Sequence, residues 1–344
     1  MRDADEIARG LAAYLSDCWE RRVEVGGLRA SSAGARRRNL LFEARDATGC
    51  ASLVITLVPP ESMPVLDVSL EAAVLDLARV SGVPVPQVHG VCRDSGWVGA
   101  PFFLTAKIEG ETVPRRVLRL VAADPALGSR LAAQCGESLA RLHATDVGRA
   151  PDDLPRPDPT SPAEHALEAV DRLLASLPQP SPVFALGLRW LARHRPPTPE
   201  RLALLHGDLR NGNLVVEKDG LVGVLDWELS HVGDPMEDPA WTCVRMWRFG
   251  NDDLEVGGFG DRRGLRAAYE AAGGVWNSDR FHWWKVLGTL RWGIGLALQA
   301  EAYLRGTTPS IVMAASGRRV AELEYDLLRL IEPARSRARG SDLA

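Results

Sequence analysis

Lysine is almost absent from this sequence of 344 residues. The chain has three lysines, Lys107, Lys218 and Lys285, and arginine supplies the other 38 of its 41 basic residues. No lysine precedes Lys107, so a site built from the first hundred residues has to take its positive charge from arginine. Any function that requires a lysine has few candidates.

Close pairs of cysteine and long apolar runs are also missing. The five cysteines are scattered and odd in number, which argues against a disulfide framework or a zinc site and favours buried free thiols. No apolar run approaches the roughly 20 residues that span a bilayer, so we expect no membrane partner. The first ten residues are acidic and lack the apolar core of a signal peptide, so we expect a cytoplasmic protein.

A large net charge is likewise absent. The formal charge is −4, and hydrophobic and charged residues make up 46% and 25% of the chain, which is ordinary for a soluble globular protein. A broad electrostatic attraction to nucleic acid is therefore not expected. The length allows one two-lobed domain or two modest domains, and the sequence leaves the oligomeric state open.

The first hundred residues alternate between strand-like segments and two helical ones. Apolar residues at every fourth position predict a helix over residues 5–20. Strands are expected at 23–30, 39–44 and 52–58 as an antiparallel meander, followed by a helix at 68–80 and strands at 86–92 and 101–106. We expect residues 1–106 to form an N-terminal lobe with an antiparallel sheet.

Beyond Glu109-Gly110 the pattern becomes mainly helical. Five prolines between Pro151 and Pro162 mark a loop within this region. Helices are expected at 129–145, 163–176, 182–194 and over much of 263–333, with a short β section at 203–228. We expect residues 107–344 to form a second, helix-rich lobe, which makes the fold class α+β.

The strongest chemical signal is the segment 206–213, His-Gly-Asp-Leu-Arg-Asn-Gly-Asn, followed by Asp226-Trp227-Glu228. Strand-like apolar runs flank Asp219-Gly220, and Asp-Gly is a strong hairpin signal. If these two residues form the loop, Asn213 faces Asp226 directly. An amide oxygen and a carboxylate brought together at the open end of a hairpin suit magnesium.

Asp208 lies five residues before Asn213, in the loop that leads into this hairpin. A carboxylate at that position can accept the proton of an attacking hydroxyl group. Asp208, Asn213 and Asp226 together fit phosphoryl transfer, in which positioning and charge neutralisation supply nearly all of the catalysis.

This motif set resembles the aminoglycoside phosphotransferase-like family, which is related to choline and homoserine kinases and more distantly to protein kinases. The resemblance rests on H-G-D-x-x-x-x-N with D-W-E eighteen residues after its Asp. It extends over roughly residues 20–330, through Leu139-Ala140-x-Leu142-His143, Gly99–Leu104 and Gly233–Trp241. It implies a bilobal, protein-kinase-like fold.

The resemblance also implies a function and a set of residues. The protein would move a phosphoryl group from magnesium-bound ATP to a hydroxyl of a small acceptor, such as an aminoglycoside or another metabolite. Asp208 would be the catalytic base, and Asn213 and Asp226 would bind magnesium. Residues 31–38 would cover the nucleotide phosphates, and the backbone of 105–108 would meet the adenine. The candidate nucleotide-binding residues are Ser31, Ser32, Gly34, Arg36, Arg38, Glu71, Thr105 and Lys107.

One position departs from the family's pattern. The family places a lysine or arginine on the third strand, where it holds the ATP phosphates and pairs with a glutamate of the following helix. Here Thr56 stands at that position, and the helix glutamate is Glu71. Either a loop arginine (Arg36, Arg37 or Arg38) substitutes, in which case Glu71 orients it, or Glu71 is unpaired and ATP binds weakly.

Two other functions stay open. A nucleotide- or ligand-binding pseudokinase with little activity would explain Thr56, although the intact Asp208, Asn213 and Asp226 argue against it. A protein kinase is disfavoured, because only Glu228–Asp238 lies between Asp226 and the next helical region, which leaves no room for a peptide-docking activation loop.

Several polar residues around the motif have a structural interpretation. His206 is expected to hydrogen-bond close to the metal-binding loop, His143 to lie in the core, and Asp238 to cap the next helix. Asp234 and Glu237 could instead face a cationic acceptor. The tryptophans of the C-terminal half could line an aromatic acceptor pocket, although helix packing is the simpler explanation.

Overall fold

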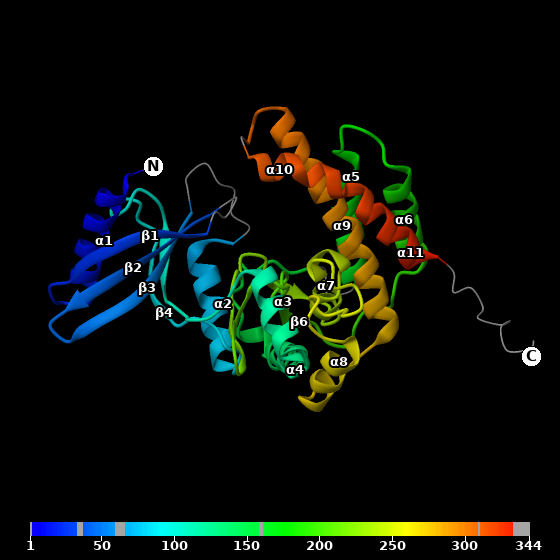
Figure 1. The fold of residues 1–344 in the computed structure, drawn as a ribbon. Helices are drawn as coiled ribbons and strands as arrows, with labels where there is room; N and C mark the ends of the chain where they lie inside the picture. Colours follow the sequence, from blue (N-terminus) through cyan, green and yellow to red (C-terminus); the bar gives the residue numbers. More distant parts are fainter. Residues whose placement is uncertain (1, 33–36, 59–65, 158–160, 309, 333–344) are drawn as a thin grey trace, which may run out of the picture.

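The computed structural model describes residues 2–32, 37–58, 66–157, 161–308 and 310–332. A sheet lobe lies at one end of the molecule and a group of helices at the other, with further helices and the small β-ribbons between them (Figure 1). This arrangement confirms the predicted α+β fold with an N-terminal antiparallel sheet and a helix-rich C-terminal region.

The N-terminal sheet has five antiparallel strands in the order β1-β2-β3-β5-β4. The strands are β1 Glu24–Ser32, β2 Arg38–Asp46, β3 Gly49–Leu57, β4 Val88–Cys92 and β5 Phe102–Ala106. Helix α1 (Ala4–Cys18) precedes the sheet and α2 (Val68–Val80) follows β3. Asp46 pairs with Gly49, so β2 and β3 are joined by the tight turn that the sequence predicts.

Two apolar cores divide this lobe. Helix α1 buries Ile7, Leu11 and Leu15 against strand residues such as Phe42 and Ile55. Helix α2, in contrast, contributes to the main core, whose other members come largely from the helical region. Most of the sheet therefore packs in a separate cluster from α2, although Phe103 of β5 joins the main core. The lobe boundary near residue 106 stays a prediction.

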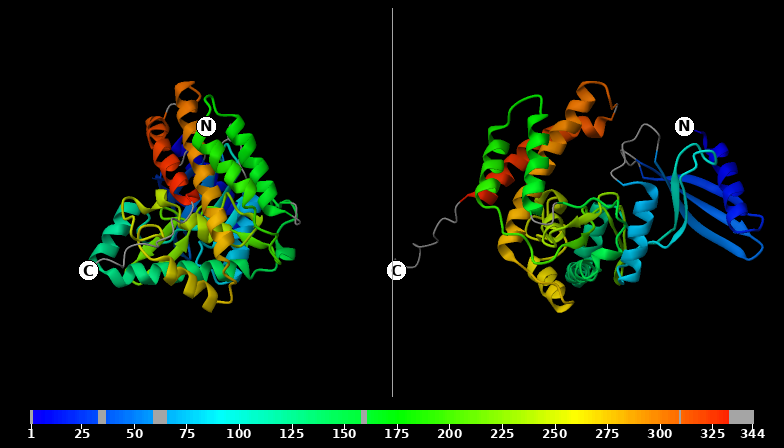
Figure 2. Two further views of the ribbon diagram at one scale, coloured as in Figure 1. Left: turned by 90° about the vertical axis from the view of Figure 1, so that its right-hand side faces the viewer. Right: turned by 180° about the vertical axis from the view of Figure 1, so that it is seen from behind.

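The C-terminal region contains nine α-helices in the part of the chain that the structure describes: α3 Pro114–Ala123, α4 Pro125–His143, α5 Pro162–Ala175, α6 Pro182–Arg193, α7 Glu237–Thr242, α8 Arg262–Ala271, α9 Ser278–Leu304, α10 Ile311–Ser316 and α11 Val320–Ile331. Short 3-10 turns lie at η1 Val147–Arg149, η2 Arg245–Arg248 and η3 Gly317–Arg319. Helix α9 packs against α5, α6 and α11, and these four helices run side by side (Figure 2).

Two small β-ribbons position the segment that carries the motif. Strand β6 (Ala203–Leu205) pairs with β9 (His231–Gly233), and β7 (Leu214–Glu217) pairs with β8 (Gly220–Val224). Helix α4 supports both ribbons from one side. It begins where Asp124 caps the helix by accepting a hydrogen bond from the backbone N–H of Ala126, with Pro125 in the first turn.

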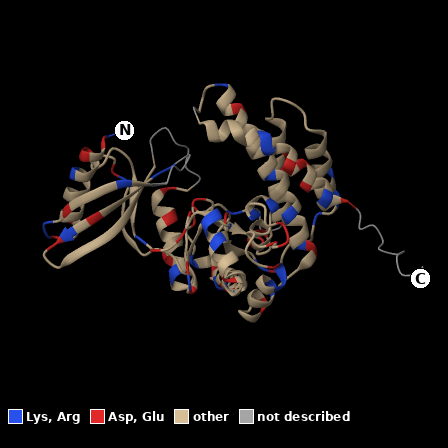
Figure 3. Cartoon of the chain, in the orientation of Figure 1, with Lys and Arg blue, Asp and Glu red and all other residues tan. Residues whose placement is uncertain are grey.

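None of the described helices is both long and apolar enough to cross a membrane. Basic and acidic residues are interspersed over both parts of the molecule, in line with the small net charge (Figure 3). Three cysteines are buried as expected, but Cys18 and Cys50 are exposed, so the expectation of buried thiols is wrong for these two.

Candidate active site

The hairpin of β7 and β8 has a different register from the predicted one. Its loop is Lys218-Asp219, because Gly220 already begins β8 and pairs with Glu217. The backbone of Gly220 has a φ of +129°, which a residue other than glycine adopts only with strain. The Asp-Gly signal therefore marked the correct hairpin but placed the loop one residue too late.

A bulge between Val215 and Val216 then shifts the pairing again. As a result the backbone N–H of Leu225 donates to the carbonyl of Asn213 at 2.8 Å, and the predicted direct pairing of Asn213 with Asp226 is wrong. Asp226 is the next residue after Leu225, so the amide and the carboxylate still lie at the same open end of the hairpin.

Asp226 occupies an unusual environment. Its backbone has a φ of +67°, the left-handed region that aspartate visits rarely. Its side chain is exposed, yet protein atoms surround it on most sides. Burial of this kind, together with the charges of Glu228 and Asp208, raises the pKa of Asp226 to about 6. Carboxylates that oppose one another's ionisation in this way form a donor set that a divalent cation would stabilise.

Asn213 links the expected metal position to the expected base. Its Nδ2 donates to Oδ2 of Asp208 at 2.8 Å and to the carbonyl of Asp208 at 2.9 Å. The amide oxygen is left as the atom that can ligate a cation. No group of three His, Cys, Asp or Glu side chains in the described residues is arranged to hold a metal. Magnesium at this position would therefore need Asn213, Asp226 and oxygens of a nucleotide.

Asp208 is held by side chains that the sequence reasoning gave no role. The indole Nε1 of Trp241 donates to Oδ1 of Asp208 at 2.7 Å. Nε of Arg210 lies 3.0 Å from Oδ1 and 3.2 Å from Oδ2. With these contacts and the bond from Asn213, the side chain of Asp208 is only 11% exposed. The signal for Arg210 is its place two residues after the base; Trp241 has no local signal, because the contact spans 33 residues of sequence.

Asp238 supports the loop that carries Asp208. It is fully buried and accepts hydrogen bonds from the backbone N–H groups of His206 and Gly207, both at 2.8 Å. Nε2 of His143 lies 3.2 Å from Oδ2 of Asp238, the oxygen that also accepts from His206, and His143 is buried in the core as expected. Burial alone would raise the pKa of Asp238, but the bond and charge of His143 hold it below the ordinary value. The expected helix cap is wrong: Asp238 lies inside α7 and holds the backbone of the loop that carries Asp208 instead.

His206 joins the loop of Asp208 to the strand that leads to Asp226. Its Nδ1 accepts the backbone N–H of Asp208 at 3.0 Å, so Nε2 is the nitrogen that donates to the carbonyl of Leu225 at 3.1 Å. Burial lowers the pKa of His206 below its usual value, which favours this neutral form. The structural role that the sequence suggested for His206 is confirmed.

Arg37 is the residue that pairs with Glu71. It lies just before β2 and forms ion pairs with Glu71 of α2 and with Oε2 of Glu228, the latter at 2.8 Å. Its side chain is only 8% exposed. Burial raises the pKa of Glu71 to about 7, while the charge of Arg37 acts in the opposite direction. Glu71 is therefore paired, and its partner is a loop arginine, as one of the two sequence hypotheses required.

The other predicted nucleotide-binding residues remain predictions. Gly34 and Arg36 lie outside the described residues. Arg38 begins β2, whereas Ser31 and Ser32 end β1. Thr105 is buried in β5. The backbone N–H groups of Ala106 and Lys107 donate to Gln87 and Ser52, and the ammonium group of Lys107 pairs with Glu109, so these groups are already engaged.

The comparison with protein families shows to which family this chain belongs. A family model described as the phosphotransferase enzyme family matches residues 27–275. The chain belongs to the phosphotransferase enzyme family. The matched stretch includes Glu71, Asp208, Asn213 and Asp226, so the resemblance seen in the sequence is confirmed at the level of the family.

The chain is similar in sequence to parts of longer curated proteins. The chain is 30% identical over 177 residues to acyl-CoA dehydrogenase family member 10 of Mus musculus, a match that covers 48% of this chain and 16% of the mouse protein. It is 26% identical over 196 residues to acyl-CoA dehydrogenase family member 11 of Homo sapiens, covering 55% and 24% of the two chains. The chain thus matches less than a quarter of the length of either relative.

Solved structures share the whole fold. A Ralstonia eutropha protein assigned to the aminoglycoside phosphotransferases superposes with a TM-score of 0.72 at 20% identity, covering 94% of this chain and 97% of that one. An aminoglycoside phosphotransferase, APH(4)-Ia, in a ternary complex with AMP-PNP and hygromycin B gives a TM-score of 0.64 at 18% identity, with coverage of 93% and 98%. The predicted protein-kinase-like fold is confirmed by these neighbours.

Proposed function

We propose that this phosphotransferase moves the terminal phosphoryl group of magnesium-bound ATP to a hydroxyl group of a small molecule. The observation that carries the proposal is the convergence of Asp208, Asn213 and Asp226 at the open end of one hairpin, with Asn213 bonded to Asp208 at 2.8 Å. Support also comes from the neighbouring fold that binds AMP-PNP together with a hydroxylated antibiotic.

Asp208 is the proposed general base. The carboxylate would take the proton of the acceptor hydroxyl as its oxygen attacks phosphorus, and the bonds from Trp241 and Asn213 would hold it in place for that step. Nε of Arg210 occupies both oxygens of Asp208 in the ligand-free protein, so an acceptor has to compete with Arg210 for this carboxylate.

Asn213 and Asp226 are the proposed ligands of magnesium. When bound, the ion neutralises charge on the phosphates and on Asp226. The residues contribute a fixed amide oxygen and a carboxylate that the bulged hairpin holds close together. The mutual repulsion of Asp226, Glu228 and Asp208 supports a cation at this position.

Arg37 is the proposed substitute for the third-strand cation. A guanidinium group can hold one carboxylate through one edge and a phosphate through another, because it carries five N–H donors in a fixed plane. Glu71 and Glu228 would orient Arg37 toward the phosphates. The presence of this cation removes the main argument for the pseudokinase alternative, which rested on Thr56.

The decisive experiment is an assay of ADP formation by the purified protein with magnesium and ATP across a panel of hydroxylated metabolites and antibiotics. For the acceptor that is found, Asp208→Asn should lower turnover by at least about a hundredfold, the usual contribution of a general base, while nucleotide binding persists. Asp219→Asn in the exposed hairpin loop is the matched control and should leave turnover unchanged. Turnover of Asp208→Asn within a few-fold of wild type would remove the assigned base.

A further inference from the structure

Asp234 and Glu237, the acidic residues that follow Asp226-Trp227-Glu228, are both paired with basic side chains of the protein. Asp234 pairs with Arg280 at 2.8 Å. Glu237 pairs with Arg291 at 3.1 Å and with His231 at 3.2 Å. Burial alone would raise the pKa of Glu237, but the charges of His231 and Arg291 lower it below its ordinary value. These acids therefore do not offer the free negative charge that a cationic acceptor would need.

Two arginines lie close to Asp208 or to the tryptophan that donates to it. Arg210 contacts Asp208 directly, and its guanidinium carbon lies 4.8 Å from the ring centroid of Trp247. The guanidinium carbon of Arg291 lies 4.8 Å from the ring centroid of Trp241, which donates to Asp208. Stacking on aromatic rings holds both arginines near the base without using their full hydrogen-bonding capacity. Their side chains remain 24% and 33% exposed, so a bound molecule can reach them.

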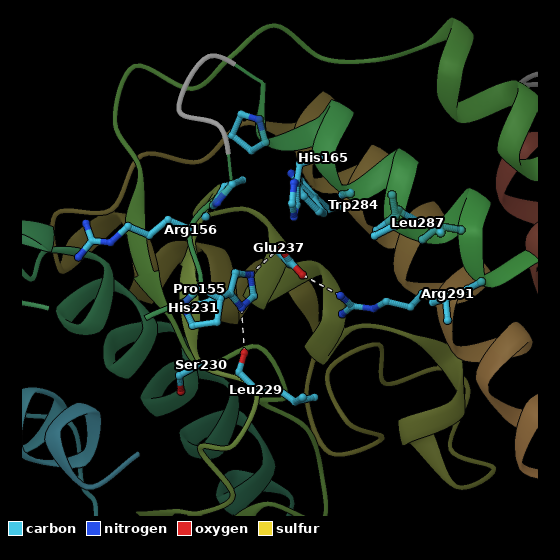
Figure 4. Close-up of a pocket in the computed structure, with 17 residues that line it drawn as sticks. Pro155, Arg156, His165, Leu229, Ser230, His231, Glu237, Trp284, Leu287 and Arg291 are labelled. Carbon is cyan, nitrogen blue, oxygen red and sulfur yellow. Dashed lines mark hydrogen bonds and ion pairs between the residues drawn. The ribbon is translucent and has the colours of Figure 1, made fainter. Parts of the chain in front are cut away.

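Arg291 also lines a pocket of about 410 Å³ between α5, α9 and the segment around β9 (Figure 4). Most of the wall is apolar and includes Leu173, Trp284 and Leu287. The basic groups on the wall are Arg156, His165, His231 and Arg291, and Glu237, the acid among them, is already paired with two of these. The pocket therefore combines apolar walls with an excess of positive charge. Trp241, which stacks with Arg291 and donates to Asp208, lies between the Arg291 end of the pocket and that carboxylate.

We propose that the phosphoryl acceptor is a hydroxylated molecule with an apolar body and an anionic group, and that this pocket holds the apolar body beside Arg291. The inference rests on the proposed function, because it assigns the acceptor of that reaction. Glu237 is the carboxylate on this wall and is shared by Arg291 and His231, whereas the guanidinium group of Arg156 bonds to backbone carbonyls. A polycation such as an aminoglycoside would therefore meet a surplus of positive charge there. An apolar acid would gain both burial and charge complementarity.

Three alcohols with the same six-carbon chain test the proposal: 6-hydroxyhexanoate, 1,6-hexanediol and 6-amino-1-hexanol. Binding is measured by the shifts of ¹⁵N-labelled indole signals and by calorimetry, and ADP formation is followed in parallel with magnesium and ATP. The anion should bind at least about tenfold more tightly than the amine, a difference of about 1.4 kcal/mol, with the diol between them. Equal affinities, the reverse order or no saturable binding at millimolar concentrations would overturn the proposal.

Two arginine variants test whether the preference for the anion arises at Arg291. Arg291→Gln should reduce the preference for the anion over the amine at least about fivefold, because it removes the charge and keeps most of the side-chain length. Arg280→Gln is the matched control: it also breaks an arginine–carboxylate pair, but one outside this pocket, and should keep the preference. Unchanged preference in an Arg291→Gln protein that still binds magnesium and ATP would show that the pocket is wrongly assigned.

The two proposals fail in different ways. If the anion binds most tightly but the wild-type protein neither binds magnesium and ATP nor forms ADP, the proposed kinase function is wrong and the ligand class of the pocket stands. If ADP forms with the amine in preference to the anion, the kinase function stands and the acceptor class is wrong.

Discussion

At the scale of single residues, Arg37 is the most consequential departure from the family's pattern. Its side chain is buried and pairs with both Glu71 and Glu228, and we propose that it replaces the cation that Thr56 cannot supply. From the sequence, the arginine that pairs with Glu71 could be any one of three consecutive arginines. Strand alternation places neighbouring residues on opposite faces, yet which face meets Glu71 depends on how β2 and α2 pack.

Arg37→Ala is expected to weaken the binding of magnesium and ATP by about 1.5–3 kcal/mol, the range for hydrogen bonds to charged groups. It should also lower the midpoint of thermal unfolding, because Glu71 and Glu228 lose their partner. Titration calorimetry with nucleotide and a thermal melt measure the two effects. Arg22→Ala, at an exposed arginine paired with Glu24 in the same lobe, is the control and should change neither. Adding Thr56→Lys to Arg37→Ala should restore part of the affinity. Wild-type affinity in Arg37→Ala would show that another group holds the phosphates.

Asp226 gives the site a dependence on pH. Its folded-state pKa of about 6 is higher than that of a free aspartate, so the folded ligand-free protein keeps a proton that the unfolded chain releases. This contribution to stability is present at low pH and is lost as pH rises toward and through about 6. Magnesium competes with the same proton, so its apparent affinity should fall as pH drops below about 6. Magnesium titrations between pH 5 and 8 test this, and an affinity that is flat over the range would contradict the assignment of Asp226.

At the scale of elements, much of the site follows from local sequence and the remainder from tertiary contacts. The existence of the β7–β8 hairpin could be predicted, because Lys218-Asp219-Gly220 separates two apolar runs. Its register could not, because the bulge after Val215 depends on packing, and a shift of one residue changes which side chains face each other. The bond from Trp241 to Asp208 joins α7 to the catalytic loop and has no local signal.

The bonds from Asp238 of α7 to the loop that carries Asp208 also contribute to the stability of the fold. Asp238→Ala would leave the backbone N–H groups of His206 and Gly207 without their acceptor and would remove the partner of His143. Because all of these groups are buried, we expect a loss of about 2–4 kcal/mol in the free energy of unfolding. Urea denaturation measures it. Asp234→Ala, which breaks a buried pair away from this loop, controls for the loss of any acid in the segment; an Asp238 variant as stable as wild type would contradict this role.

At the scale of the whole molecule, α2 couples the sheet to the rest of the site. Its apolar face belongs to the main core with the helical region, while its Glu71 meets Arg37 from the start of β2 and Arg37 meets Glu228 from beyond β8. The fold class and the order of its parts could be predicted from periodicity and from the motif. The boundary between lobes could not be fixed in the same way, because α2 is adjacent to the sheet in sequence but packs in the main core.

The measurement that tests the central claim most directly is a titration of ATP with and without magnesium, for the wild type and for Asp226→Ala and Asn213→Ala. A kinase site built on this hairpin predicts magnesium-dependent binding that Asp226→Ala weakens more than Asn213→Ala, because a carboxylate carries a full charge and an amide only a dipole. No binding of ATP by the wild type at millimolar concentrations, or equal losses in both variants without any dependence on magnesium, would contradict the account.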